Sequence, residues 1–334
     1  MIFFIINQKG NVKAKVNVSP KLLLSISSLY EPIRVLLEFV DNAIDAAEAF
    51  FTPETNSYSK KIEISVSIDG DSYEYARIEI KDNCTGIRSL EKLFSSIGNS
   101  SKAGDEASNG QFGFGVMSHP FICSTMKINS KHYDNDYAEM VKVTSEILNS
   151  SSPEGAEVEI TKIPGLIYTL SNPRSPGVWI TLEDFHKETF KELKAKAIKS
   201  EIEKHFEDIL RRENISITVI DFKRRKSDEG REIFECTPFD YESYEGITFE
   251  RTLHTLEYIK SKRYSTVGTL DISATPVKIY LRIFTKNSLG RLPVFTIKGR
   301  RISEVSENKN FKSNSKILVW SNTNISGRIN VTGI

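Results

Sequence analysis

The residues with the clearest potential for chemistry are three closely spaced glycines, Gly110, Gly113 and Gly115, in the run GQFGFGVMS. Glycine lets the backbone adopt positive φ and approach a ligand closely, which leaves amide N–H groups free to bind an anion. A helix start is plausible at Val116, and the N-terminus of a helix favours negative charge. The run therefore predicts a phosphate cradle, although it is weak evidence by itself.

Two familiar nucleotide-binding loops fit this run poorly. A Walker A loop ends in Gly-Lys-Ser or Gly-Lys-Thr, and the chain contains no such run. A Rossmann loop follows a hydrophobic first strand directly, whereas a small, polar stretch (97–109) precedes these glycines. That stretch has the composition of a mobile loop. Other motifs must therefore specify what the glycines bind.

A second polar group lies upstream, in residues 31–50 (EPIRVLLEFVDNAIDAAEAF). A helix with Pro32 in its first turn would place four polar side chains on one face, namely Glu38, Asp41, Asn42 and Asp45. Apolar residues would occupy the opposite face, which predicts a helix packed on a core: Ile33, Leu36, Val40, Ile44 and Ala47. A surface helix with a solvated acidic face would show the same pattern, so the helix alone leaves its role open.

A third polar group follows a predicted pair of strands. Apolar residues alternate with polar ones over 62–68, and again over 76–80, which predicts two neighbouring antiparallel strands. The second strand runs into DNCTGI (82–87). An Asp at the end of a strand is often only a turn residue. Its place in this run favours a functional role.

In this order and at these spacings, the three motifs resemble those of the GHKL ATPases, which include gyrase B, the 90-kilodalton heat-shock chaperones, histidine kinases and MutL. The resemblance rests on Glu38–Asp45 (EFVDNAID), Asp82–Ile87 and Ser100–Gly115, and it covers residues 1 to about 222. It implies a Bergerat-type α/β sandwich of class α+β, a mixed and mainly antiparallel sheet with helices on one face. It also implies ATP and Mg²⁺ as cofactors.

The resemblance assigns roles to the polar face of the helix. Glu38 would be the general base that polarises the attacking water. Asn42 would give its side-chain oxygen to Mg²⁺, because a hard cation takes oxygen ligands and keeps most of its waters. Asp45 would line the phosphate or sugar end of the nucleotide. For Asp41 and Asp45 a structural role is an equal alternative.

The resemblance also assigns the base pocket, with two departures from the family pattern. Asp82 would accept a hydrogen bond from the adenine amino group, and Gly86 and Ile87 would line the pocket. Cys84 replaces the Gly of D-N-G-x-G, so its Cβ is expected to crowd the base or oppose a special backbone angle; a packed thiol is favoured over a redox switch. Val178 replaces a hydroxyl residue that helps to hold adenine, a loss of about 0.5–1.5 kcal/mol. We therefore expect modest ATP affinity.

The lid and the phosphate loop complete the implied site. Ser100, Ser101 and Lys102 would belong to the lid, with Lys102 near the phosphates as a second catalytic residue. A solvated loop lysine is the competing interpretation. The backbone amides of the glycine-rich run would wrap the β- and γ-phosphates, through Gly110, Gln111, Phe112, Gly113, Phe114 and Gly115.

The chain of 334 residues is long enough for two domains. We expect an ATP-binding domain at 1–222, with a strand at 177–185, a helix over 187–212 and a strand at 215–221. A charged run, KRRKSDEGRE (223–232), marks the boundary. The second domain, 223–334, would be a smaller α/β, transducer-like domain, truncated at its C-terminal end. There we expect a helix near 248–263 and strands at 266–272, 277–284, 293–297 and from 327.

The family's branches differ in ways that this sequence can separate. Fewer than forty residues precede Glu38, which leaves little room for the phosphoacceptor hairpin of a histidine kinase. MutL proteins read G-x-R-G-E-A in the third motif, and GQFGFGVMS does not match that pattern. The chain looks most like the heat-shock-chaperone and MORC-type members. Such members hydrolyse ATP slowly and close as N-terminal homodimers. Their phosphate-sensing Lys or Arg is expected beyond Ile334, with Lys286 a weaker stand-in.

Composition limits the partners but does not identify them. The chain has 45 Lys and Arg against 44 Asp and Glu, so its net charge points to no partner. Three widely spaced cysteines lack zinc-ligand spacing and fit a reducing compartment. The opening MIFFII is too short to span a membrane. We expect a cytoplasmic protein, or a nuclear one in a eukaryote, with no membrane partner.

Two further interpretations stay open. One is a nucleotide-gated clamp on DNA or on a protein client, in which basic residues neutralise phosphates. The candidates are Lys223, Arg224, Arg225, Lys226, Lys260, Lys262, Arg263, Arg300 and Arg301. Solvated charge is the commoner explanation for such residues. The other interpretation is a degenerate nucleotide-binding or scaffold domain without turnover.

Overall fold

The computed structural model describes residues 11–16, 31–96, 117–149, 156–164, 176–222, 231–259, 267–285, 291–307, 320 and 322–331. The chain divides into two compact units. Unit 1 comprises Met1–Glu201 and Arg212–Cys236, and unit 2 comprises Ile202–Arg211 and Thr237–Ile334. The boundary that we expect at residues 222 and 223, with the roles of the two domains, stays a prediction.

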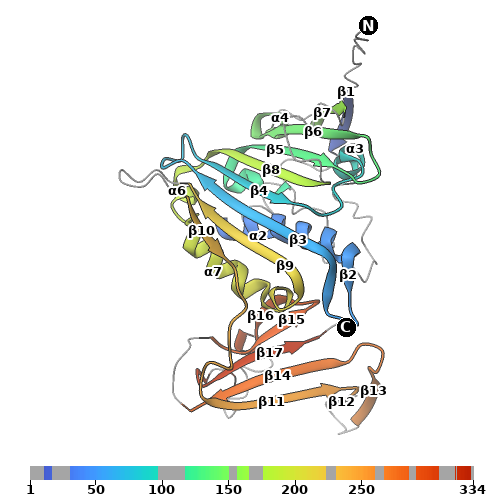
Figure 1. Cartoon of the computed structure of the whole chain (residues 1–334), viewed down its shortest axis with the longest axis vertical. Coiled ribbons are helices and arrows are strands. Elements are labelled where there is room, and N and C mark those ends of the chain that lie inside the picture. The colour runs from blue at the N-terminus through green and yellow to red at the C-terminus, as the bar shows by residue number, and fades with distance from the viewer. Residues whose placement is uncertain are drawn as a thin grey trace. The chain divides into compact units, whose positions relative to one another are not determined.

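Unit 1 is built on a ten-stranded sheet with the order β1-β7-β6-β5-β8-β4-β3-β9-β10, and β2 pairs with β3 beside this path (Figure 1). Its neighbours pair antiparallel except β3 and β9, which run parallel. A large, mixed, mainly antiparallel sheet with few helices confirms the α+β, Bergerat-type fold. The strands are β1 (Asn11–Val16), β2 (Phe51–Thr52), β3 (Ser57–Asp69), β4 (Arg77–Asp82), β5 (Cys123–Lys131), β6 (Tyr137–Thr144), β7 (Ala156–Pro164), β8 (Gly177–Phe185), β9 (Glu213–Asp221) and β10 (Glu232–Glu235).

Helix α2 (Pro32–Ala47) is the helix predicted over the acidic motif, and it lies behind β3 in the view of Figure 1. Pro32 occupies its first turn, where the missing N–H has no partner to lose. The apolar stripe is buried as expected, since Leu36, Val40, Ile44 and Ala47 are each 0% exposed. Burial of such side chains stabilises a fold by about 1.5–3 kcal/mol each. This packing fixes which way the polar face of α2 turns.

Arg212, at the start of β9, anchors the C-terminal end of α2. Its Nη1 donates to Glu48 Oε1 at 2.6 Å and to the Tyr58 hydroxyl at 2.8 Å. The guanidinium also lies over the ring of Phe51, 3.9 Å from the centroid. Glu48 is the residue that caps α2. One largely buried guanidinium therefore joins α2, β2, β3 and β9.

The predicted helix over 187–212 is wrong as a single element. The segment forms three short helices, α6 (Lys187–Phe190), α7 (Ala195–His205) and α8 (Glu207–Leu210), and Arg212 lies beyond the last. By the division given above, α8 and the end of α7 belong to unit 2. The other helices described in unit 1 are α3 (Leu90–Ser95) and α4 (Ser145–Asn149), with the 3₁₀ turns Glu48–Phe50 and His119–Phe121. Apolar residues at spacings of three to five indicate a helix, but this spacing does not show where one short helix ends and the next begins.

Unit 2 carries a five-stranded sheet with the order β11-β14-β17-β15-β16, and a separate two-stranded sheet of β12 and β13. The predicted helix near 248–263 is wrong, because β11 and β12 occupy most of that segment. Its Thr, Ile and Phe residues favour strands, and all of β11 pairs with β14. The strands are β11 (Gly246–Leu253), β12 (Thr255–Ile259), β13 (Val267–Asp271), β14 (Val277–Phe284), β15 (Val294–Ile297), β16 (Arg300–Glu304) and β17 (Ile325–Asn330).

None of the helices in the described ranges is long and apolar enough to cross a membrane.

Removal of the Arg212 anchor is expected to destabilise unit 1. Arg212→Ala leaves Glu48 without its partner and loses the contacts with the two rings, so we expect the free energy of unfolding to fall by about 2 kcal/mol. Urea denaturation measures this change. Arg88→Ala is the matched control, because Arg88 pairs with Asp134 but its side chain is 71% exposed. An exposed pair contributes less than about 1 kcal/mol, and equal losses in the two variants would contradict the assignment.

Candidate functional site

Part of the predicted site lies outside the described residues. The lid and the glycine-rich phosphate loop fall there, so their predicted contacts stay predictions: Ser100, Ser101, Lys102, Gly110, Gln111, Phe112, Gly113, Phe114 and Gly115. Lys286 also falls outside them. The polar face of α2 and the loop 82–87 are described, together with the start of β8.

On α2, the predicted base Glu38 is partly shielded from water, with a side chain that is 21% exposed. Burial raises the pKa of Glu38, the nearby charge of Arg34 lowers it, and the charge of Asp41 raises it. Arg34 lies one turn earlier and places Nε 3.2 Å from Glu38 Oε1. Asn42 is exposed, and Asp41 and Asp45 are half-buried. The polar face of α2 therefore presents the Glu38 carboxylate, with a raised proton affinity, one turn away from the exposed amide of Asn42.

Asp82 ends β4, and its carboxylate is held by the backbone of two other segments. Its Oδ1 accepts hydrogen bonds from Cys84 N at 2.8 Å and from Val178 N at 3.4 Å. Loss of hydration raises the pKa of Asp82 to about 6, against the lowering effect of these hydrogen bonds and of the Lys60 charge. A carboxyl group that titrates near neutrality marks a functional-site candidate, because folding alone does not favour it.

Cys84 does not oppose a special backbone angle, and the expected crowding of the base stays a prediction. Its φ is not positive, and its side chain is 0% exposed. The thiol donates to the carbonyl oxygen of Ala43 in α2 at 3.3 Å, and burial raises the pKa of Cys84. The thiol is therefore packed, as expected, and links the loop to α2 one residue beyond Asn42.

Gly86 and Ile87 lie against the end of β5. Gly86 has φ +73°, and a Cβ there would come within 2.0 Å of the Lys131 carbonyl oxygen, so only glycine fits without a shift. Ile87 N donates to Ser130 Oγ at 2.7 Å, and Tyr133 N donates to the Thr85 carbonyl at 3.1 Å. These contacts fix the loop from the β5 side.

Two residues missed by the sequence reasoning fix the loop from the β3 side. The Asn83 side chain donates to the Lys61 carbonyl and accepts from Glu63 N, both at 2.9 Å. Lys60 Nζ donates to the Asn83 carbonyl oxygen and lies 4.2 Å from the centre of the Phe50 ring. The sequence carries one signal for Lys60, because it stands where the alternation of Tyr58 and Ile62 with polar residues would place an apolar side chain, but its partner on the 82–87 loop is not readable from that pattern.

Gly177 is a third residue whose contact with Asp82 the sequence reasoning did not predict. It opens β8 with φ +150°, and a Cβ there would come within 2.1 Å of the Asp82 carbonyl oxygen. This close approach lets the next residue, Val178, direct its N–H at the Asp82 carboxylate. Val178 thus contacts Asp82 through its backbone N–H, a bond that does not depend on the hydroxyl that its side chain lacks.

Residues 30–163 match the family model described as histidine kinase-, DNA gyrase B- and HSP90-like ATPase. The match includes α2, the 82–87 loop and β5, but it ends before β8, which contributes Val178 to the described part of the candidate site. This part of the chain belongs to the GHKL superfamily. No curated protein matches the chain. The membership supports ATP binding as the general activity.

The described residues fit the nucleotide of a GHKL domain in two respects. The Asp82 carboxylate is a group that can accept a hydrogen bond from an amino group, and the positive φ of Gly86 allows close approach to the backbone. For the cation, no group of three His, Cys, Asp or Glu side chains comes together in the described ranges. The oxygen of the exposed Asn42 amide nevertheless suits Mg²⁺, which needs few protein ligands when phosphates and water supply the rest.

The raised pKa of Asp82 predicts a pH-dependent stability. The folded protein binds this proton more tightly than the unfolded chain, whose ordinary value is 3.8, so the folded state loses stability as pH rises from there through about 6. Asp82→Asn removes the ionisation. We expect it to raise the free energy of unfolding at about pH 8 by about 1–3 kcal/mol more than at about pH 4.

Urea denaturation of the two proteins at both pH values measures this difference. The control is Asp71→Asn, since Asp71 is exposed in the turn that joins β3 and β4. Its effect should be the same at the two pH values. If Asp82→Asn also changes stability equally at both, the carboxylate is not desolvated in the folded state.

Proposed function

We propose that the chain is a Mg²⁺-dependent GHKL ATPase that binds ATP between α2 and the 82–87 loop and hydrolyses it slowly. The observation that carries this proposal is the coincidence of the family match with the described site. The matched segment contains both a shielded, proton-attracting Glu38 and a desolvated Asp82. Structural stability alone explains neither placement, because each carboxylate is more favourable in water.

Glu38 would act as the general base. Its shielding from water raises its proton affinity, which suits a group that must take a proton from an attacking water near neutral pH. The Arg34 contact at Oε1 leaves the other carboxylate oxygen to orient that water. Lys102, from the lid, would add positive charge near the phosphates. Such positioning and charge stabilisation provide most of the catalysis in phosphoryl transfer.

The remaining residues would bind the nucleotide. Asn42 would hold Mg²⁺ through its amide oxygen, and the cation would neutralise charge on the phosphates when bound. Asp45 would line the phosphate or sugar end, and the glycine-rich run 110–115 would wrap the phosphates. Asp82, Gly86, Ile87 and Val178 would form the base pocket.

Glu38→Ala is expected to separate binding from turnover. Loss of a general base lowers the rate by about 10²-fold or more, while the phosphate and base contacts remain. Steady-state ATP hydrolysis and equilibrium ATP binding measure the two effects. The matched control is Glu31→Ala, because Glu31 is an exposed acid at the start of the same helix and its side chain does not cap it. Unchanged turnover in Glu38→Ala would refute the base assignment.

ATP with Mg²⁺ should also stabilise the folded protein. A ligand at 100 times its dissociation constant adds about 2.7 kcal/mol, because it binds only the folded state. Thermal unfolding with and without the nucleotide measures this effect. The alternative of a degenerate scaffold domain predicts an unchanged melting temperature, and a shift without turnover would indicate a nucleotide-binding domain that has lost hydrolysis.

We further propose an ATP-dependent homodimer that closes as a clamp on a protein client, in the cytoplasm or the nucleus, as in the heat-shock-chaperone and MORC-type members. DNA is a less favoured client on the described residues. Arg300 is 3% exposed, and Arg301 is paired with Glu304 at 3.1 Å, so neither presents an unpaired surface charge to a phosphate backbone. The other basic candidates lie outside the described residues.

A further inference from the structure

Arg34 is the one basic residue of α2, and it stands where the stability of the helix does not favour it. It is the third residue of α2, in the first turn, where the helix macrodipole favours an acid and disfavours a cation. Its side chain is 42% exposed, so it does not fill the core either. The reason for this residue therefore has to come from its partner on the polar face of α2.

That partner is Glu38, the proposed base. The two residues are four apart in the helix, so they share one face, and Arg34 Nε lies 3.2 Å from Glu38 Oε1. In such helical pairs the order with the cation on the N-terminal side is the less favourable one, and pairs open to water contribute little to stability. The pair thus adds little to the helix, but it holds one oxygen of the Glu38 carboxylate in place.

A general base needs two properties that burial does not provide. Its carboxylate has to direct one oxygen at the attacking water, and it has to be ionised near neutral pH, because a protonated carboxyl group cannot take a proton. Burial raises the pKa of Glu38, and the charge of Asp41 raises it further. The charge of Arg34 and its hydrogen bond lower that pKa. Arg34 therefore acts on both properties, through one contact.

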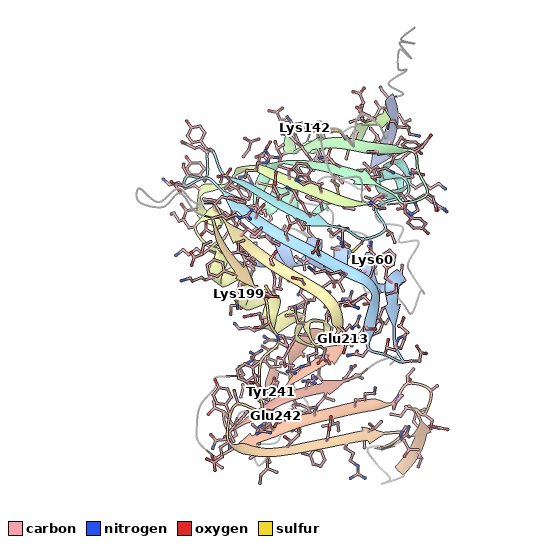
Figure 2. All side chains as sticks on the ribbon, in the orientation of Figure 1. Lys60, Lys142, Lys199, Glu213, Tyr241 and Glu242 are labelled. Carbon is pink, nitrogen blue, oxygen red and sulfur yellow. The ribbon has the colours of Figure 1, made fainter. Side chains whose placement is uncertain are left out.

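The strands beside α2 hold their charged groups in contacts of their own. Helix α2 packs against β3 and β4, and alternation places only Lys60 and Asp82, among the charged residues of these strands, on the face with the buried isoleucines. Lys60, which Figure 2 shows on β3, donates to the carbonyl oxygen of Asn83. The Asp82 carboxylate accepts from two backbone N–H groups. Both groups are thus engaged at the 82–87 loop.

The two 3₁₀ turns that also pack against α2 contribute one acid and one histidine. Glu48 is held in an ion pair, and His119 is 0% exposed. Within the described ranges, the charges with the largest effect on Glu38 are those of Arg34 and Asp41. Arg34 is therefore the cation that chiefly favours the ionised form of the proposed base.

We propose that Arg34 positions the proposed base: its guanidinium holds Oε1 of Glu38, so that the carboxylate stays ionised with its other oxygen directed at the attacking water. This inference rests on the proposed function, and it adds a positioning residue to the same site. The proton of the water moves to Glu38, and none is exchanged with Arg34. Arg34 acts only through Glu38.

The test is the pH dependence of ATP turnover, with kcat and KM measured from about pH 5.5 to about pH 8.5. Arg34→Met removes the charge and keeps an unbranched side chain, and Arg34→Lys keeps the charge. In Arg34→Met we expect kcat to fall about threefold to tenfold more at about pH 6 than at about pH 8, because Glu38 then stays protonated to a higher pH. KM should stay within about twofold of wild type, and Arg34→Lys should restore the pH profile.

Arg77→Met is the matched control. Arg77 is an arginine with nearly the same exposure, 44% against 42%, and it also pairs with a glutamate, Glu79, but that pair lies on the opposite face of the sheet from α2. Its variant should keep the wild-type pH profile. A purely structural role for Arg34 would lower kcat by the same factor at every pH, and that result in Arg34→Met would overturn the proposal.

A second measurement needs no nucleotide. Carbon-13 NMR titration of the Glu38 carboxyl group in the nucleotide-free protein should show a higher pKa in Arg34→Met than in wild type, Arg34→Lys or Arg77→Met. If the wild-type protein hydrolyses no ATP, the proposed function fails and the role of Arg34 in turnover fails with it, whatever the titration shows. If ATP is hydrolysed but the pKa of Glu38 does not respond to Arg34, only the positioning role fails.

Discussion

Desolvation of the Asp82 carboxylate is the constraint around which the described site is arranged. A carboxylate loses hydration when it leaves water, and only fixed donors and nearby positive charge compensate for that loss. Here the donors are backbone N–H groups from the loop itself and from β8, and the charge comes from Lys60 on β3. The N–H from β8 and the charge from β3 reach Asp82 because these two strands are the neighbours of β4 in the sheet, in the order β8-β4-β3.

The same sheet also sets the position of α2. Its apolar stripe packs with the core, the Cys84 thiol joins it to the loop, and Arg212 holds its far end. The acidic face is then left to turn away from the core with Glu38 partly shielded. The carboxylates of Glu38 and Asp82 would each be more stable in water. Packing in the rest of the fold keeps them in place, as is usual for a functional site that lowers stability locally.

Sequence reasoning predicted those parts of the fold that are fixed by local pattern. Alternation identified β3 and β4, and the stripe from Leu36 to Ala47 identified the buried face of α2. It failed where pairing overrides periodicity, as in β11, and where a helix is interrupted, as after Phe190. Within the site, motif order gave Asp82 and Gly86. The contacts of Lys60, Asn83 and Gly177 were not predicted because their partners lie in segments distant in sequence.

Asn83 has a structural role within the same short motif as Asp82, the proposed base-binding residue. Its amide donates to one backbone carbonyl of β3 and accepts from one backbone N–H, so the side chain takes the place of a peptide group and extends the ladder past the end of β4. A carboxylate has no hydrogen to donate, and a hydroxyl has a single oxygen where the amide uses two separate atoms. The Asn of D-N-x-T-G-I is therefore explained by the shape of the turn, whereas the preceding Asp is the residue that we propose binds the base. A chain that kept this Asn and lost the Asp would keep the turn without the proposed contact to the base.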